Sequence, residues 1–111
     1  MNIQIYGAKK CFDTKKAERY FKERKIPFQS IDIHRFGMSK SVFESATRCI
    51  DVEDMIDRKT KAYKDLYMDY IDEKKREGTL FENPALFRTP IVRNGKEFTL
   101  GYCPDVWKNW E

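Results

Sequence analysis

Three cysteines are the residues of this sequence best suited to covalent chemistry, and Cys11 has the most favourable setting. It lies where the loop after a predicted first strand meets the start of a predicted helix. Unpaired backbone N–H groups and the positive end of a helix dipole favour the thiolate, which is the reactive form of cysteine. Lys9, Lys10, Lys15 and Lys16 add positive charge nearby. Position alone leaves two interpretations open, an activated nucleophile or an ordinary loop or buried cysteine.

The other two cysteines and the single histidine carry weaker signals. Cys49 falls on the apolar stripe of a predicted helix, so we expect a small core residue. Cys103 follows the last predicted strand, where a structural or incidental thiol is the simpler interpretation. No CxxC is present, and in a reducing compartment we expect free thiols. Nothing in the sequence brings His34 to Cys11, so we expect a solvated or capping histidine; metal-ligand spacing is absent.

Three arginines are candidate anion ligands, because a guanidinium group matches the geometry of an oxyanion. They are Arg58, Arg88 and Arg93, and the alternative is that they are solvated surface residues in a chain rich in basic side chains. The dipeptide Thr89-Pro90 is a possible cis peptide bond. Most bonds that precede proline are trans, so the pattern alone does not predict one.

Length and composition indicate one folded domain over residues 1–111, with 41% hydrophobic and 14% aromatic residues. The net charge of +4 is weakly basic, and its lysines and arginines are interspersed with acidic residues, so we expect no nucleic-acid partner. No apolar run approaches the roughly 18 residues of a membrane span. The first residues do not have the pattern of a signal peptide, so we expect a cytoplasmic protein that does not bind membranes.

The elements that must position Cys11 begin with a βαβ unit. Residues 2–6 alternate between polar and apolar and predict a strand, a helix follows from Phe12 and stops before Pro27, and residues 28–33 predict a second strand. Two strands joined by one helix in so short a stretch are expected to be parallel.

The middle of the chain is predicted to be helical. One helix opens after Gly37, with capping-box spacing between Ser41 and Glu44. A short helix is expected at 52–58, a third at 69–77 that ends at Gly78, and one further turn at 79–83.

The last part of the chain predicts a β-hairpin followed by a closing helix. Residues 91–93 and 97–100 form the hairpin around the turn dipeptide Asn94-Gly95, and the helix covers 104–110. The whole order predicts an α/β thioredoxin-like fold (βαβ…ββα) with a mixed four-stranded sheet. An all-helical insertion is expected at approximately residues 38–86.

Several motifs resemble the ArsC-type arsenate reductases and their relatives, the Spx regulators and YffB-like proteins. They cover essentially the whole chain in order: Tyr6-Gly7-x3-Cys11-x3-Lys15-Lys16-Ala17, then Asp57-Arg58-Lys59 with Tyr63 and Leu66, then Asn83-Pro84-x-Leu86-x-Arg88-Thr89-Pro90-Ile91-Val92, and Leu100-Gly101-Tyr102. None of these motifs separates one branch from another.

The resemblance implies a mechanism. Cys11 would be the nucleophile that attacks arsenate, Arg58 and Arg88 would hold the oxyanion, and Pro90 would be the cis-proline beside the active cysteine. Thr14 keeps a hydroxyl near Cys11 and is counted among the residues expected to contact substrate. No bound cofactor is implied; glutathione would be a co-substrate, and glutaredoxin a partner protein.

Three departures from the family pattern bear on these expectations. The third family arginine falls on Gly101, and Arg93 would replace it only if the hairpin turned its side chain inward. Asp13 stands where the family commonly has a hydroxyl residue; it would raise the pKa of Cys11 if it pointed at the thiol, or cap the helix if it pointed away.

Thr14 stands where Spx has the second cysteine of its CxxC switch, so a local disulfide is impossible. The sequence therefore predicts a thiol-dependent oxidoreductase that acts on a small oxyanion or a glutathione-linked substrate. Two alternatives stay open, an Spx-like regulator that binds the α-subunit of RNA polymerase, and a glutathione-linked thiol protein that does not act on arsenate.

Overall fold

The computed structural model, which describes residues 1–111, is built on a mixed four-stranded sheet with the strand order β2-β1-β3-β4. The strands are β1 (Ile3–Gly7), β2 (Phe28–Asp32), β3 (Ile91–Asn94) and β4 (Glu97–Leu100). β1 is parallel to β2 and antiparallel to β3, and β3 pairs antiparallel with β4. This sheet confirms the predicted thioredoxin-like α/β fold.

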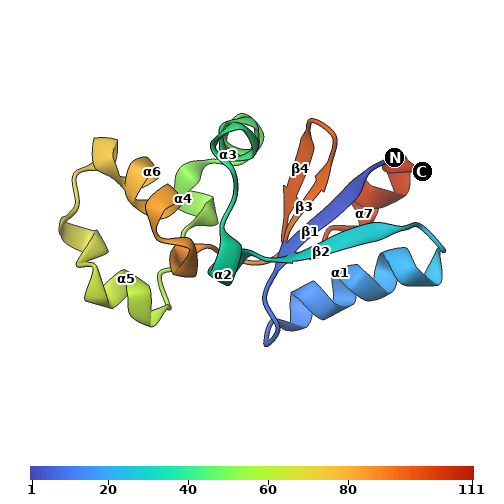
Figure 1. Ribbon diagram of the computed structural model, residues 1–111, viewed down its shortest axis with the longest axis horizontal. Helices are drawn as coiled ribbons and strands as arrows, with labels where there is room; N and C mark the ends of the chain where they lie inside the picture. The colour runs from blue at the N-terminus through green and yellow to red at the C-terminus, as the bar shows by residue number, and fades with distance from the viewer.

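The molecule is elongated, with extents of 44 × 26 × 22 Å (Figure 1). The α-helices are α1 (Phe12–Glu23), α2 (Ile33–Phe36), α3 (Lys40–Thr47), α4 (Val52–Met55), α5 (Lys61–Asp65), α6 (Glu73–Glu82) and α7 (Pro104–Trp107). Three 3₁₀ turns are η1 (Met68–Tyr70), η2 (Pro84–Leu86) and η3 (Lys108–Trp110). α1 and α7 lie beside the sheet, whereas α4, α5 and α6 form the opposite end of the molecule (Figure 1). No helix is long and apolar enough to cross a membrane.

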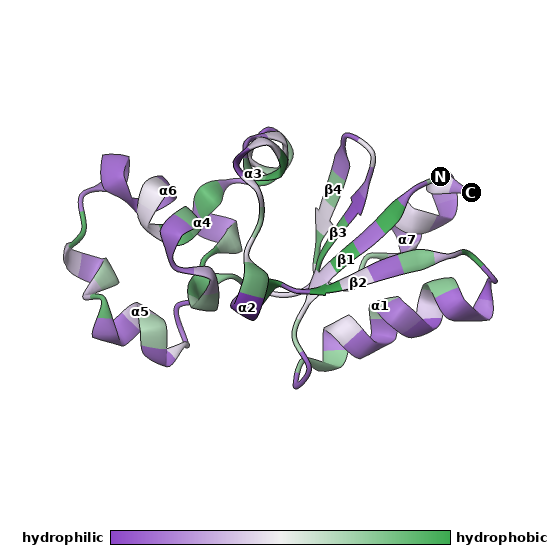
Figure 2. Cartoon of the chain, in the orientation of Figure 1, coloured by the Kyte–Doolittle hydropathy of each residue, from purple (hydrophilic) through white to green (hydrophobic).

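α1 and α7 pack on one face of the sheet. Ile3 and Ile5 of β1 and Val92 of β3 point to this face, where they meet Phe21 of α1 and Trp107 of α7. The Phe21 and Trp107 ring centroids are 5.1 Å apart. Figure 2 shows apolar and hydrophilic residues interleaved along α1, as expected for a helix with one buried side. This packing holds α1 against the sheet.

The helical end has its own apolar cluster, which is continuous with the second face of the sheet. Tyr6, Ile91 and Phe98 contribute from the strands, and the helical residues include Met55 and Leu80. One partly buried ion pair crosses this end, between Arg76 of α6 and Glu53 of α4, with N–O distances of 2.7 and 2.9 Å. Arg76 also donates to the Met68 carbonyl and to the Tyr63 hydroxyl.

Some local expectations about the helices are wrong. Gly78 does not end a helix but lies inside α6, and Ser39 rather than Ser41 caps α3, by accepting a bond from the Val42 N–H at 3.3 Å. Helices α2 and α5 were not predicted.

The hairpin turn also differs from the expected one. Asn94 still pairs with Glu97, so the two turn residues are Gly95 and Lys96, with Gly95 at φ +61°. Glycine adopts a positive φ without steric cost because it has no Cβ.

Candidate active site

Cys11 is the N-cap residue of α1, with extended backbone angles (φ −94°, ψ 119°). The residues after β1 turn tightly, because the Cys11 N–H donates to the Ala8 carbonyl at 3.2 Å. The Cys11 carbonyl accepts the Lys15 N–H at 3.2 Å, which makes it the first acceptor of the helix. The side chain is half-buried, and its thiol lies 3.6 Å from the Thr89 carbonyl oxygen. The predicted position at a helix start is therefore what the structure shows.

The environment of Cys11 favours its ionised form. Burial raises the pKa of the thiol, but hydrogen bonds from the side chains of Thr14 and Thr89 and from the backbone N–H groups of Thr14 and Asp13 outweigh it, so the pKa is lowered. The two backbone donors belong to the first turn of α1, where N–H groups have no partner within the helix. The helix start thus acts on the sulfur through specific amides as well as through its dipole.

Thr14 is held in place by the chain around it. Only 6% of its surface is exposed, and its Oγ1 accepts the Ala8 N–H at 3.2 Å. It packs directly on Gly7, the last residue of β1: a Cβ on Gly7 would overlap Thr14 Cγ2 and lie 2.7 Å from Oγ1. Glycine at position 7 is therefore a condition for the observed position of the hydroxyl that bonds to Cys11.

The peptide bond between Thr89 and Pro90 is cis. Pro90 is buried at the start of β3, and its carbonyl accepts the Gly101 N–H at 2.8 Å. This connection fixes the chain that places the Thr89 carbonyl beside the Cys11 thiol.

Cys11 opens into a cavity of about 330 Å³. Its lining comprises Ala8, Lys10, Cys11, His34, Asp57, Arg88 and Thr89. Arg88 is anchored through its backbone, whose N–H donates to the Met55 carbonyl at 2.7 Å, and its guanidinium lies 3.4 Å from the Asp54 carbonyl. Two cations, Lys10 and Arg88, therefore line the same cavity as the sulfur, and a small anion there would meet both.

A sequence model of the ArsC family matches residues 6–110. The chain belongs to the ArsC family. It is similar to global transcriptional regulator Spx 2 of Oceanobacillus iheyensis, with 28% identity over 109 residues that cover 95% of this chain and 80% of the relative. It is also similar to global transcriptional regulator Spx of Enterococcus faecalis, with 29% identity over 110 residues that cover 93% and 81%.

Solved structures of the family share the fold. An arsenate reductase from Vibrio cholerae superposes with a TM-score of 0.81 at 20% identity, covering 98% of this chain and 97% of that one. An arsenate reductase (ArsC) related protein from Brucella melitensis superposes with a TM-score of 0.67 at 17% identity, covering 99% and 94%. The family resemblance inferred from the motifs is confirmed.

The arginines expected from ArsC reductases are not equally close to the thiol. Arg88 lines the Cys11 cavity, whereas Arg58 lies outside it, in a neighbouring cavity of about 520 Å³ that both arginines line. The Arg58 guanidinium lies 3.3 Å from Glu53 Oε1, an exposed ion pair. Arg93 donates to the Gly95 carbonyl at 2.8 Å and to Gln4 Oε1 at 2.9 Å, so the hairpin does not turn it toward Cys11.

Gly101 occupies the place of the third ArsC arginine with a backbone that suits glycine, at φ +84°. Asp13 acts on Cys11 through its backbone N–H, which lowers the pKa of the thiol, and it is not a helix cap. Its carboxylate instead adds to burial in raising the pKa of Cys103, against a hydrogen bond with Thr99 that lowers it.

The expectation for Cys49 is wrong, whereas His34 is exposed as expected but lies closer to Cys11 than the sequence indicated. His34 lines the Cys11 cavity, with Nε2 2.9 Å from the Phe87 carbonyl oxygen. Asp57, which the motif analysis quoted without a role, lines it too. Parallel strands end at the same edge of a sheet, and His34 follows β2 as Cys11 follows β1, so that rule could have placed His34. Cys49 is exposed rather than in the core, and its thiol donates to the Lys96 carbonyl at 3.4 Å.

Proposed function

We propose that this ArsC-family chain is a thiol-dependent oxidoreductase in which Cys11 attacks a small anionic oxidant, with arsenate as the first substrate to test. The observation that carries the proposal is the position of Cys11, whose lowered thiol pKa coincides with a cavity lined by Lys10 and Arg88. A nucleophilic thiolate beside two cations combines activation with anion binding in one place.

The proposed reaction begins with the oxyanion in the cavity between Lys10 and Arg88. The Cys11 thiolate attacks arsenic, a hydroxide leaves and takes up a proton as water, and an S–As bond forms. Glutathione, with glutaredoxin, supplies the second thiol. In total, one arsenate and two thiols give one arsenite, one disulfide and one water. The chain needs no resident cofactor for these steps, because glutathione enters as a co-substrate.

The supporting residues have separate roles in this proposal. Thr14 and the amides at the start of α1 stabilise the thiolate. Pro90, whose carbonyl accepts the Gly101 N–H, holds the segment that carries Arg88 and Thr89. Arg58 would reach the oxyanion only after releasing Glu53, so we propose that Arg88 is the principal clamp and Arg58 an auxiliary one.

The test is arsenate-dependent turnover with glutathione and glutaredoxin. We expect Cys11→Ser to abolish turnover and Cys49→Ser, at an exposed thiol, to leave it unchanged. Removing a charge-assisted contact typically costs about 1.5–3 kcal/mol, so Arg88→Ala should lower kcat/KM roughly 10- to 150-fold. We expect a smaller effect from Arg58→Ala. Equal rates for the wild type and Cys11→Ser would contradict a catalytic cysteine.

A substrate linked to glutathione is the nearest variant of this proposal. It predicts that Cys11 exchanges with glutathione disulfide while arsenate produces no turnover. Running both substrates on the same wild-type preparation distinguishes the two.

A second candidate function follows from the curated relatives, which are Spx transcriptional regulators at 28–29% identity. It is an Spx-like protein that binds the α-subunit of RNA polymerase through its surface. Because Thr14 replaces a second cysteine, such binding would not depend on a local disulfide. A pull-down with purified α-subunit tests it: binding that Cys11→Ser retains, together with no turnover, favours the regulator.

A further inference from the structure

The outer side of α1 carries an exposed surface of which the proposed reaction at Cys11 uses only Lys10. Phe12, Lys15, Lys16 and Arg19 follow the spacing i, i+3, i+4 and i+7, which places them on one side of a helix. All four are exposed, and Phe12, directly after Cys11, is 80% exposed. Together with two exposed lysines of the preceding loop they form what we call the α1 surface: Lys9, Lys10, Phe12, Lys15, Lys16 and Arg19.

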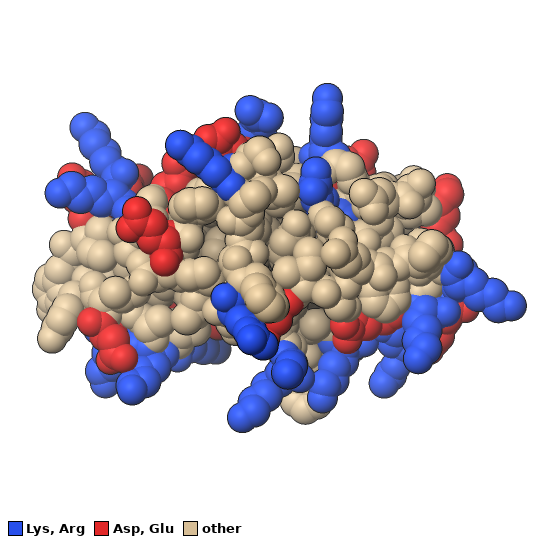
Figure 3. Space-filling model, viewed as in Figure 1, with Lys and Arg blue, Asp and Glu red and all other residues tan.

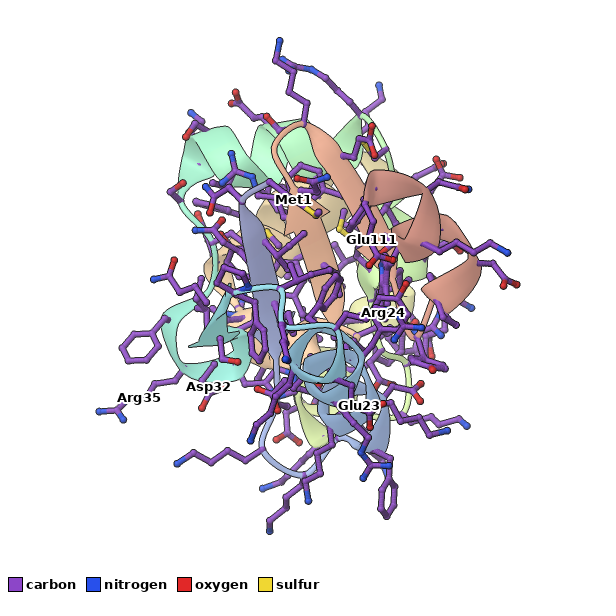
Figure 4. The ribbon with its side chains drawn as sticks, turned by 90° about the vertical axis from the view of Figure 1, so that its right-hand side faces the viewer. Met1, Glu23, Arg24, Asp32, Arg35 and Glu111 are labelled. Carbon is purple, nitrogen blue, oxygen red and sulfur yellow. The ribbon has the colours of Figure 1, made fainter.

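The positive charge of the α1 surface is not neutralised within the chain. None of its five cations forms an ion pair, and the ion pairs of the protein lie elsewhere. At the far end of the same helix, Arg24 lies near Glu111, with Nε 3.8 Å from the carboxylate (Figure 4). Figure 3 shows Lys and Arg side chains projecting along the edge of the molecule where α1 runs.

Two acidic residues of α1 lie beside this surface without forming ion pairs with it. Glu18 lines a cavity with Lys9 and Lys15, and Glu23 lines another with Lys16 and Arg19. Glu18 accepts a bond from the Ser30 hydroxyl of β2 at 2.5 Å, and Asp13 is half-buried near Cys103. Lys16 has only a cation–π contact, 5.7 Å from the Tyr102 ring centroid. The surface therefore combines an exposed aromatic ring, unpaired cations and an adjoining reactive sulfur.

We propose that the α1 surface is the docking site for an acidic thiol–disulfide reductase that reduces Cys11. This rests on the proposed function, since Cys11 must become oxidised to need a reductant. Phe12 follows Cys11 directly and is exposed, and Lys10 belongs both to this surface and to the Cys11 cavity, so a protein that brings its own thiol to Cys11 would approach the α1 surface. Carboxylates around that thiol would meet the five cations, and an apolar spot would bury the ring.

The redox step can be written with Cys11 joined to glutathione in a mixed disulfide. The reductase thiolate attacks the glutathione sulfur, the S–S bond breaks, and Cys11 leaves as the thiolate. The second thiol of the reductase then releases glutathione and closes the reductase's own disulfide. Two electrons pass from the dithiol to the mixed disulfide, and the released thiolates take up the two thiol protons.

The test uses the full chain in a Cys49→Ser, Cys103→Ser background, so that only Cys11 can react. Chemically activated glutathione makes the mixed disulfide, which keeps the measurement independent of any natural oxidant. Two reductants of the mixed disulfide are compared, an acidic dithiol glutaredoxin and dithiothreitol. The readout is the second-order rate constant for reduction by the glutaredoxin divided by the one for reduction by dithiothreitol. The test variants are Phe12→Ala and Lys15→Glu/Lys16→Glu.

Matched controls use distant exposed residues. Tyr70→Ala, at a residue that is 86% exposed at the helical end, is the control for Phe12→Ala. Lys40→Glu/Lys74→Glu is the control for Lys15→Glu/Lys16→Glu, because it makes the same change in net charge. We expect Lys15→Glu/Lys16→Glu to lower the ratio about tenfold at roughly 20 mM salt and less than about twofold at roughly 500 mM, where charges are screened. Phe12→Ala should lower it about fivefold at both salt concentrations. The controls should change it less than about twofold at either salt.

Two outcomes would overturn the docking proposal. One is a ratio of rate constants that stays unchanged in Phe12→Ala and in Lys15→Glu/Lys16→Glu. The other is binding of a single-stranded oligonucleotide that depends on Lys15 and Lys16 while the ratio stays constant, which would assign the surface to nucleic acid. If the wild-type chain shows no arsenate turnover while the ratio of rate constants responds to the α1 variants as expected, only the proposed function fails. The two failures are therefore distinguishable.

Discussion

Gly7 offers a direct test of how the chain activates Cys11. Replacing it with alanine places a Cβ against the side chain of Thr14, overlapping Cγ2 and lying 2.7 Å from Oγ1. Thr14 is buried and its hydroxyl is bonded to the Ala8 N–H, so it cannot move without losing that bond. One methyl group at position 7 therefore disturbs the hydroxyl that lowers the pKa of Cys11.

The expected cost has two parts. Overpacking a well-filled site usually costs about 1–3 kcal/mol, which for a chain of this size corresponds to a fall in Tm of roughly 5–15 °C. Displacement of the Thr14 hydroxyl also raises the pKa of Cys11, so the thiolate fraction at neutral pH falls and alkylation slows. Gly78→Ala is the matched control: it adds the same methyl in open space inside α6 and should stabilise by about 0.5–1 kcal/mol.

Urea unfolding followed by circular dichroism measures the first effect, and the pH dependence of iodoacetamide alkylation measures the second. Thr14→Ser in the Gly7→Ala chain removes Cγ2 but leaves the 2.7 Å approach to the hydroxyl oxygen, so it should restore only part of the stability and part of the reactivity. Thr14→Ala in that chain should restore stability only. A Gly7→Ala protein as stable and as reactive as the wild type would refute the proposed link between Gly7, Thr14 and Cys11.

Three further predictions concern other parts of the chain. Cys11 should be alkylated faster than Cys103 at neutral pH, because the first thiol has a lowered pKa and the second a raised one; mass spectrometry of digested protein measures both. Arg76→Met should destabilise by about 2 kcal/mol in urea titrations, less than for a fully buried pair because Glu53 is 41% exposed. Arg76 lowers the pKa of Glu53, so the stabilisation is present above the unfolded-state pKa of about 4.3, and the difference between the two proteins should shrink as pH falls below it. Gly101→Ala should destabilise by about 1–2 kcal/mol in the same titrations, because φ is +84° in otherwise open space.

The sheet and the position of Cys11 were predictable because they depend on local patterns. Alternation marks β1 and β2, the turn residues mark the hairpin, and one helix between two strands predicts their parallel pairing. The position of Cys49 failed for a specific reason: α3 ends at Thr47, so the apolar stripe stops before that residue. Gly78 was misplaced because buried Arg76 and Leu80 hold α6 together across it.

The cavity was less predictable, because long-range pairing assembles one wall of it. The Asp57 N–H donates to the Leu86 carbonyl and the Arg88 N–H to the Met55 carbonyl, both at 2.7 Å, around a bridge between Ile56 and Phe87. These bonds join segments about thirty residues apart, and no local periodicity encodes them. They place Arg88 and Asp57 in the Cys11 cavity and leave the neighbouring Arg58 outside it.

The distribution of cations bears on which anionic oxidant suits Cys11. A compact oxyanion needs several donors converging on one point, but Arg88 is the only guanidinium in the cavity, since Arg58 pairs with Glu53 and Gly101 has no side chain. A glutathione disulfide carries carboxylates several ångströms from its sulfurs, so it does not need such convergence. Adding positive charge at the cavity should help arsenate more than glutathione disulfide. Releasing Arg58 with Glu53→Gln should therefore raise the ratio of arsenate to glutathione-disulfide kcat/KM, and adding Arg58→Ala should cancel the rise. Because Glu53 also pairs with Arg76, Arg76→Met is the control, and a ratio that is the same in Glu53→Gln and in Glu53→Gln/Arg58→Ala would show that Arg58 takes no part.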